Sequence, residues 1–433
     1  MSKLYILGAT VLLIACNSFH SLQSGFVRKS PYEQYRKSLE DANLLATPMA
    51  TAWVEAGRRS LYDSIQINLP FSEAGVFQAA EPQARSYSFA VKDGQVLKVS
   101  GMVKAQANAN IFLDLFVWKD TTWTQVTHAD SALTLSYEFD RDAKCLLRLQ
   151  PELLVNAYYS VTISLTPVLI NPVTGASNRS IGSFYGDTRD GGTRKHEGVD
   201  IFAPKGTPIV APAAGVVTRV GTSNLGGKVV WMQDGKRGHS YYFAHLDEQL
   251  VKSGQKLKQG DTLGLVGNTG NARTTPAHLH FGIYQARAKD PIHYLLTQDA
   301  LKSDSPLDTL FQEQVYRVTA KKSMMRTGPG VKYPLKETLD KNDYVRIVAQ
   351  SDAWYRVVLA DERQGYVEKK LVGEAIKGKA RKLDAPVVLL SRNDRQSVPL
   401  AYLDKASAVE ILASYKSSHF VRTKGGQVGW LLL

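Results

Sequence analysis

Histidines are concentrated in one part of this 433-residue chain, where six of the nine lie between positions 196 and 293. Five chemically useful side chains fall in three short segments, H-E-G-V-D at 196–200, Y-F-A-H-L at 242–246 and H-L-H-F-G at 278–282. Imidazole and carboxylate groups are ligands for zinc, and a catalytic zinc typically keeps three protein ligands and one water. A fold that uses these segments together must therefore bring distant parts of the chain to one place.

The spacing of His278 and His280 indicates a β-strand. Side chains alternate between the two faces of a strand, so residues two apart point to the same side. The intervening and following residues Leu279, Phe281 and Ile283 are apolar, as expected for the face that packs into a core. Both imidazoles should therefore face one site.

His196 and Asp200 are four residues apart in a glycine-containing segment that enters the apolar run 199–202. This pattern predicts a loop that leads into a strand, and it differs from the helical H-E-x-x-H of common metalloproteases. A single histidine in an apolar run is usually a core or surface residue. The coincidence of three such segments favours a metal site instead.

The order H-x-x-x-D, Y-x-A-H-L and H-L-H-F resembles that of the lysostaphin-type (LytM-like) zinc endopeptidases of the bacterial cell wall. The resemblance covers about residues 175–297 and includes flanking segments at 198–201, 206–209, 211–217 and 264–270. It implies one Zn²⁺ in the peptidase domain, with peptidoglycan as the substrate. The implied zinc ligands are His196, Asp200 and His280, and the implied catalytic pair is His245 and His278.

The mechanism that the resemblance implies rests on histidine chemistry. Zinc lowers the pKa of a bound water from about 15.7 to about 7 and polarises the carbonyl of the scissile bond. A neutral histidine can accept the water proton, and another can stabilise the oxyanion or protonate the leaving amine. His245 and His278 are the candidates, and the choice of general base between them stays open. His239 and His293 do not match the motifs, so structural or exposed positions are expected for them.

Two departures from the family pattern lie close to the H-x-H motif. Many relatives carry an acidic residue directly after the phenylalanine, where this chain has Gly282. Residues 271–277 also differ from the small-residue pattern that usually precedes the motif. Neither departure removes an expected ligand.

The first sixteen residues indicate export and lipid attachment. Lys3 precedes an apolar run at 4–14, which is typical of a secretory signal and is shorter than the roughly 20 residues of a membrane span. Residues 13–16, Leu-Ile-Ala-Cys, resemble the lipobox of bacterial lipoproteins, which implies cleavage before Cys16 and acylation of that cysteine. Asn17 is not the aspartate that favours inner-membrane retention, so the expected location is the periplasmic face of the outer membrane.

The cysteines and the net charge argue against two other functions, catalysis by a thiol and binding of nucleic acid. Cys145 has no partner once Cys16 carries lipid, and its apolar surroundings predict a buried free thiol rather than a nucleophile. The net charge of +13 is spread along the chain, so nucleic acid is not expected as a partner. An anionic wall polymer, a lipid head-group surface or ordinary solubility explains the charge.

The sequence predicts a mostly β, multidomain protein. The expected parts are a signal peptide at 1–15, a tether at 16–30, a short helical segment at 31–66, a β-sandwich at 67–168, the antiparallel-β peptidase domain at 175–297 and two small SH3-like β-barrels at 314–374 and 379–433. Residues 171–180, rich in Asn, Pro, Gly and Ser, are expected to form the linker into the peptidase domain. The period-two runs between 86 and 165 predict the sandwich.

The C-terminal part contains an internal repeat that resembles bacterial SH3-like domains, and its second copy is degenerate. Arg326 and Trp354 are 28 positions apart, while Arg392 and His419 are 27 apart. Near-equal offsets between equivalent residues indicate duplication. Such domains in relatives bind wall peptides or protein partners, and a structural barrel packed on the peptidase domain is the alternative.

Two functions compete at this point. The first is a lipid-anchored zinc endopeptidase that cuts peptidoglycan, with D-Ala to diaminopimelate cross-links as the expected bonds, during wall remodelling or division. The second is a non-catalytic wall-binding activator or scaffold for another hydrolase. The complete ligand set favours the enzyme, with cell-division or wall-synthesis proteins as possible partners. Position alone motivates the further hypothesis that the N-terminal helices control access to the site.

Overall fold

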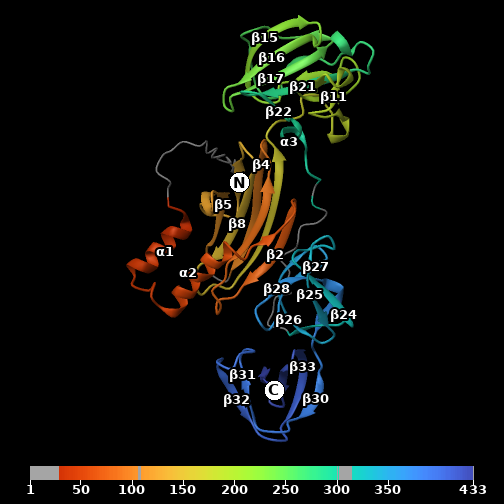
Figure 1. Cartoon of the computed structure of the whole chain (residues 1–433). Coiled ribbons are helices and arrows are strands. Elements are labelled where there is room, and N and C mark those ends of the chain that lie inside the picture. Colours follow the sequence, from red (N-terminus) through yellow and green to blue (C-terminus); the bar gives the residue numbers. More distant parts are fainter. Residues whose placement is uncertain (1–28, 106–108, 300, 302–314, 433) are drawn as a thin grey trace, which may run out of the picture.

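The computed structural model describes residues 29–105, 109–299, 301 and 315–432. Most of this chain forms β-strands, which confirms the expected mostly β, multidomain fold. Its parts are arranged end to end in an elongated molecule (Figure 1). The predicted signal peptide, Cys16 and most of the tether lie outside the described residues. None of the helices within the described ranges is long and apolar enough to cross a membrane.

Two sheets packed face to face form the middle of the molecule. One sheet has the order β1 (Ile65–Gln66), β3 (Arg85–Val91), β8 (Ala143–Pro151), β5 (Ile111–Lys119) and β6 (Thr122–His128). The other contains β2 (Phe71–Phe77), β9 (Ala157–Pro167), β4 (Gln95–Ala105) and β7 (Leu135–Glu138) in that order. Strand β9 alternates strictly between buried and half-buried residues, as expected for a sheet with one face on a core.

The N-terminal helices α1 (Pro31–Asp41) and α2 (Pro48–Ser60) belong to this sandwich. Ser30 caps α1 in a reciprocal capping box with Glu33. Trp53 of α2 is fully buried and donates its indole N–H to the carbonyl of Pro151 at 2.7 Å. Its cluster includes Phe112, which points to the side of β5 opposite the sandwich core. The helices therefore cover the outer face of the sandwich, and these contacts give no support to the hypothesis that they control access to the peptidase site.

The first SH3-like part extends a sheet of the sandwich. It contains β23 (Tyr316–Val318), β24 (Lys322–Arg326), β25 (Leu335–Asp340), β26 (Tyr344–Ser351), β27 (Trp354–Val358), β28 (Gln364–Glu368) and β29 (Val372–Glu374). Strand β26 pairs with β2, with Ala74 opposite Gln350 and Gly75 opposite Ala349. One eleven-stranded sheet therefore runs from the sandwich into this part of the chain. The alternative of a barrel packed on the peptidase domain is not what the structure shows.

A buried carboxylate lies at the seam between β2 and the SH3-like strands. Glu73 is fully buried and accepts hydrogen bonds from the hydroxyls of Tyr87 at 2.5 Å, Tyr159 at 2.8 Å and Tyr366. The guanidinium of Arg356, also buried, lies 3.4 Å from the same carboxylate. A buried charge is tolerated when it is paired and hydrogen-bonded, so this cluster joins the two parts of the chain.

The C-terminal sheet repeats the strand order of the first SH3-like part. Its strands are β30 (Lys379–Lys382), β33 (Ala408–Tyr415), β34 (Ser418–Thr423), β35 (Val428–Leu431), β31 (Val387–Leu390) and β32 (Pro399–Leu403), in that spatial order. The spatial strand order β26-β27-β28-β24-β25 in the first part corresponds strand for strand to the order β33-β34-β35-β31-β32 in the second. The pairing of β23 with β26 likewise corresponds to that of β30 with β33.

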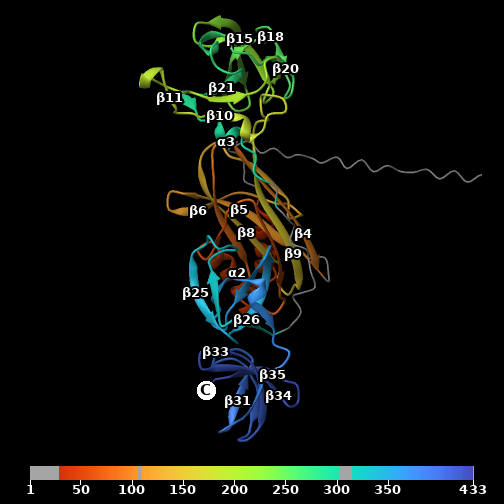
Figure 2. The same ribbon diagram turned by 90° about the vertical axis from the view of Figure 1, so that its right-hand side faces the viewer.

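The histidine-rich part forms a separate antiparallel sheet at the other end of the molecule (Figure 2). Its order is β10 (Ile181–Ser183), β13 (Val199–Phe202), β21 (His278–Tyr284), β17 (His239–Leu246), β16 (Gly227–Asp234), β15 (Gly215–Ser223) and β19 (Lys256–Leu257), with β22 (Ala288–Lys289) also paired to β21. Smaller sheets join β11 (Thr188–Arg189) to β12 (Arg194–Lys195) and β20 (Thr262–Leu265) to β14 (Pro208–Val210) and β18 (Glu248–Gln249). Val173, in the expected linker, is buried in this core.

Ion pairs fix this sheet to the end of the sandwich. Arg237, in the turn between β16 and β17, lies 2.6 Å from Glu138 at the end of β7. Lys289 of β22 lies 2.6 Å from Asp93 in the turn between β3 and β4. The short helix α3 (Ile292–Leu295) also packs here, with Tyr294 against Gly94.

The seam cluster predicts a large cost for losing its carboxylate. Glu73→Ala leaves Arg356 buried without its partner, so we expect the free energy of unfolding to fall by about 3–5 kcal/mol. Glu55→Ala is the matched control, because that solvent-accessible carboxylate also pairs with an arginine, Arg58, at 2.7 Å. The loss of such a surface pair should lower the free energy of unfolding far less. Urea unfolding followed by tryptophan fluorescence measures both, and equal shifts would contradict the assigned role of Glu73.

Candidate metal centre

The pairing of β13 with β21 creates the histidine cluster. Asp200 lies directly opposite His280 in this antiparallel pair, so their side chains project from the same face. Leu279, between the two histidines of β21, is fully buried in the core on the other face. Ala244 of β17 lies opposite His280 on its other side.

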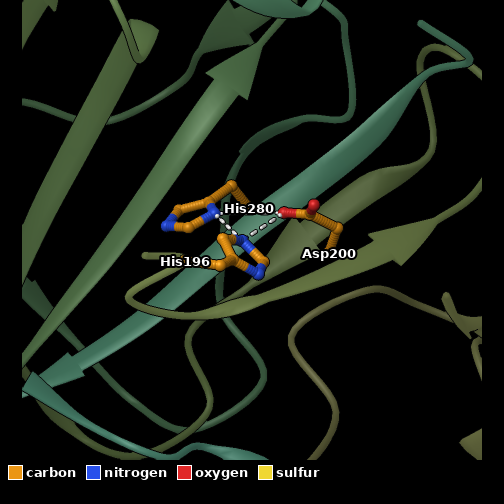
Figure 3. Close-up of side chains that lie close together, drawn as sticks. All are labelled: His196, Asp200 and His280. Atoms are coloured by element: carbon orange, nitrogen blue, oxygen red, sulfur yellow. Dashed lines mark hydrogen bonds and ion pairs between the residues drawn. The ribbon is translucent and has the colours of Figure 1, made fainter. Parts of the chain in front are cut away.

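His196 completes the cluster from the loop that precedes β13 (Figure 3). The donor atoms of His196, Asp200 and His280 all lie within 4.8 Å of one another. Oδ1 of Asp200 is 3.0 Å from Nε2 of His196 and 3.0 Å from Nδ1 of His280, and these two nitrogens are 2.8 Å apart. Two imidazole nitrogens and one carboxylate oxygen that converge in this way form a donor set that fits zinc.

The protonation states of these groups suit metal binding. Burial alone would raise the pKa of Asp200, but the hydrogen bonds to His196 and His280 hold it well below its usual range. The carboxylate is therefore ionised at neutral pH. Burial lowers the pKa of His280, which favours the neutral imidazole that binds metals.

Three histidines are oriented by the same kind of hydrogen bond. Nδ1 of His196 lies 2.8 Å from the carbonyl oxygen of Phe184. Nδ1 of His245 lies 2.9 Å from the carbonyl oxygen of Thr269, and Nδ1 of His278 lies 2.8 Å from that of Pro276. A carbonyl only accepts, so Nδ1 carries a proton in each ring. A bond of this kind sets the tautomer and orientation of a metal-binding or catalytic histidine.

His245 and His278 lie next to the cluster. Their ring centroids are 5.0 Å apart, and Nε2 of His278 is 4.0 Å from Oδ1 of Asp200. Both rings are buried, and burial lowers the pKa of His245 to about 4. The backbone of His245 has φ of 64°, a left-handed conformation that is costly for a residue other than glycine and is found mostly at functional sites.

All five predicted site residues thus meet on one face of the sheet, whereas three other candidates lie elsewhere. His239 begins β17 and contacts Tyr294, with 5.5 Å between ring centroids, near the sandwich. His293 lies in the short helix α3. Cys145 is fully buried in the sandwich core, and burial raises the pKa of its thiol to about 12, as suits an inert side chain.

Arg189 is a member of the site that the motifs did not reveal. Its Nη2 lies 3.1 Å from Oδ2 of Asp200 and also contacts the hydroxyl of Ser183. The arginine therefore holds the carboxylate oxygen that faces away from the two histidines. Arg189 lies on the short strand β11, seven residues before His196, and no spacing rule connects such an arginine with a metal ligand.

The contact between Arg189 and Asp200 predicts an effect on metal affinity. In Arg189→Ala the carboxylate loses the group that orients it, so we expect zinc affinity to fall by about 10-fold or more, with partial recovery in Arg189→Lys. Competition with a chromophoric chelator measures this. Arg194→Ala is the control, since Arg194 pairs with Asp190 at 2.9 Å and not with the cluster; an equal loss in both variants would contradict the orienting role.

Comparison with known proteins assigns two segments of the chain. Residues 194–292 match the model of peptidase family M23, and residues 319–374 match that of a bacterial SH3 domain. The chain therefore carries an M23 metallopeptidase domain together with a bacterial SH3 domain. The resemblance to lysostaphin-type peptidases is confirmed.

Individual relatives are similar to this chain mainly over the peptidase domain. An L-Ala–D-Glu endopeptidase of Bacillus subtilis is 37% identical over 122 residues, which are 26% of this chain and 37% of that protein. The peptidoglycan DD-endopeptidase ShyC of Vibrio cholerae is 40% identical over 121 residues, 28% of this chain and 24% of that protein. The uncharacterized lipoprotein YgeR of Escherichia coli is 40% identical over 112 residues, 26% of this chain and 42% of that protein. The chain thus spans less than half the length of each of these three relatives.

Proposed function

We propose that this protein is a zinc-dependent endopeptidase that hydrolyses peptide bonds in peptidoglycan. The observation that carries the proposal is the convergence of His196, Asp200 and His280 with two further oriented histidines beside them. The name of the V. cholerae relative, a peptidoglycan DD-endopeptidase, supports this substrate class, and the B. subtilis relative is named as an L-Ala–D-Glu endopeptidase. The alternative, a non-catalytic wall-binding activator, does not require a complete ligand set.

The residues of the site divide into two roles in this proposal. His196, Asp200 and His280 would hold one zinc ion, which when bound activates water and polarises the carbonyl of the scissile bond. Nδ1 of His245 and Nδ1 of His278 each donate to a backbone carbonyl, so Nε2 is the nitrogen of each ring that is left for the substrate. Because burial keeps His245 neutral at pH 7, it can accept a proton from water and return it to the leaving amine. Nε2 of His278, which lies closer to Asp200, can stabilise the oxyanion when it carries a proton to donate.

We also propose a cellular location for the protein and the peptide bond that it cleaves. A secretory signal at 1–15 and acylation of Cys16 would anchor the enzyme at the periplasmic face of the outer membrane, and the relation to a named lipoprotein supports an envelope location. Cross-links between stem peptides are the proposed bonds, because cutting them opens the wall for growth or division. Cell-division or wall-synthesis proteins are the proposed partners.

Removal of a ligand should abolish both metal binding and turnover. We expect His280→Ala to lose stoichiometric zinc and all release of uncross-linked products from purified cross-linked muropeptides, since two donors cannot hold a catalytic zinc at micromolar protein. His128→Ala, in the sandwich, is the control. Mass spectrometry of the products identifies the bond. Full turnover in His280→Ala would contradict the assignment of His280 as a zinc ligand. No turnover in a zinc-loaded wild-type chain would contradict the enzyme and favour the activator.

Replacement of the adjacent histidine should separate chemistry from metal binding. In His245→Ala we expect kcat to fall by about 10²–10⁴-fold, the usual contribution of a general acid–base group, while zinc content stays at that of the wild type. Steady-state kinetics and metal analysis on the same preparation measure the two quantities. Loss of zinc together with activity would show that His245 supports the metal site rather than proton transfer.

A further inference from the structure

The sheet face that carries the histidine cluster also carries three aromatic side chains. Trp231 on β16 lies opposite Tyr242 on β17, which lies opposite Gly282 on β21. Ring centroids are 4.4 Å apart for Trp231 and Tyr242 and 5.3 Å apart for Trp231 and Tyr284. We call Trp231, Tyr242 and Tyr284 the aromatic platform. It adjoins the candidate metal centre directly, because the ring of Tyr242 is 5.8 Å from that of His280.

The platform is not part of the hydrophobic core. Its three rings are half-buried, whereas their neighbours on the other face, Val230 and Ile283 among them, are fully buried in the core. The solvated face of an antiparallel sheet normally carries polar side chains. Adjacent aromatic rings on such a face, continuous with a catalytic cluster, indicate a surface that binds a ligand.

Gly282 makes room for this arrangement. A Cβ atom at that position would lie 2.8 Å from a ring carbon of Tyr284 and 3.1 Å from the carbonyl oxygen of Glu197. Any larger residue there would displace the Tyr284 ring, whose hydroxyl donates to Glu197 at 3.4 Å. The glycine that departs from the family pattern is therefore the residue that lets the platform reach along β21 from the H-x-H motif.

We infer that the aromatic platform binds a sugar ring of the glycan strand to which the cleaved peptide is attached. This rests on the proposed function and names the part of the substrate that the site recognises besides the peptide. A pyranose has apolar C–H faces that pack on aromatic rings and hydroxyls that need hydrogen bonds. The same sheet face supplies polar groups beside the rings: Gln233 and Ser240, which bond to each other at 2.7 Å, and the exposed Arg219 opposite Trp231.

The distances agree with a substrate that spans both sites. Successive ring centroids from His280 to Tyr242 and then to Trp231 are 5.8 and 4.4 Å apart. An extended peptide covers about 3.3–3.6 Å per residue, so at most about three residues separate a bond at the histidine cluster from a group on Trp231. A stem peptide is short enough for its sugar to reach the platform while its own bonds lie at the metal centre.

The test compares two substrates with the same peptide. One is a cross-linked muropeptide that keeps its disaccharides, and the other is the same peptide dimer freed of sugar by an amidase. With the full mature chain we expect a higher kcat/KM on the sugar-bearing substrate. Trp231→Ala should lower that value about tenfold, the scale of one well-packed aromatic contact, and leave kcat/KM on the free peptide unchanged. Tyr284→Ala should act in the same direction.

Trp118→Ala is the matched control, because Trp118 is an exposed aromatic on the sandwich, 40% accessible and in contact with Trp123. Trp118→Ala should leave kcat/KM unchanged on both substrates. Equal losses on both substrates in the Trp231 and Tyr284 variants, or a wild-type chain that does not distinguish the substrates, would overturn the inference.

Direct binding separates this inference from the proposed function. The reduced disaccharide of N-acetylglucosamine and N-acetylmuramic acid, which has no peptide, is titrated into the full mature chain and followed by tryptophan fluorescence and NMR. Binding that Trp231→Ala weakens about tenfold supports the platform even for a chain without turnover. Absence of binding to the wild type, or binding that Trp231→Ala leaves unchanged, overturns it.

Discussion

The antiparallel register of β13 and β21 is the constraint on which the site depends. Asp200 opposes His280 only because their neighbours are paired as well, with Ile201 opposite Leu279 and all four residues locked between a core and an open face. A slip by one residue would turn Asp200 towards the core and expose apolar side chains. The hydrophobic core below the sheet therefore fixes the geometry of the ligands above it.

Much of this could be predicted from the sequence because it follows from local periodicity. The H-x-H spacing on a strand with apolar neighbours led to a shared face for His278 and His280, and the structure has that strand. Arg189 and Glu73 could not be found in this way. Arg189 reaches Asp200 from the two-residue strand β11, which carries no motif, and Glu73 meets Arg356 across 283 positions of sequence. A single acidic residue in an apolar strand carries no local sign of its partner, since only the pairing of β2 with β26 brings that partner close.

This long-range pairing changes how the accessory parts relate to the enzyme. A binding domain on a flexible linker raises the local concentration of its ligand over a wide volume. Here the SH3-like strands continue a sheet of the sandwich, and the peptidase sheet is attached to the opposite end of the sandwich through Arg237 and Glu138. Within the described residues the parts are joined by paired strands and charges (Figure 1). A wall ligand held by the SH3-like part would thus lie in a set direction from the metal centre.

The site itself also depends on its surroundings, because hydrogen bonds from the backbone hold its histidines in place. Backbone carbonyls fix the Nδ1 proton of His196, His245 and His278, so each ring can turn only one nitrogen towards the reacting groups. The strained backbone of His245, with φ of 64°, persists because the surrounding sheet and the carbonyl of Thr269 hold the residue in place. Burial then keeps that imidazole neutral over a wide pH range. The surrounding structure thus sets both the position of the His245 ring and its protonation state.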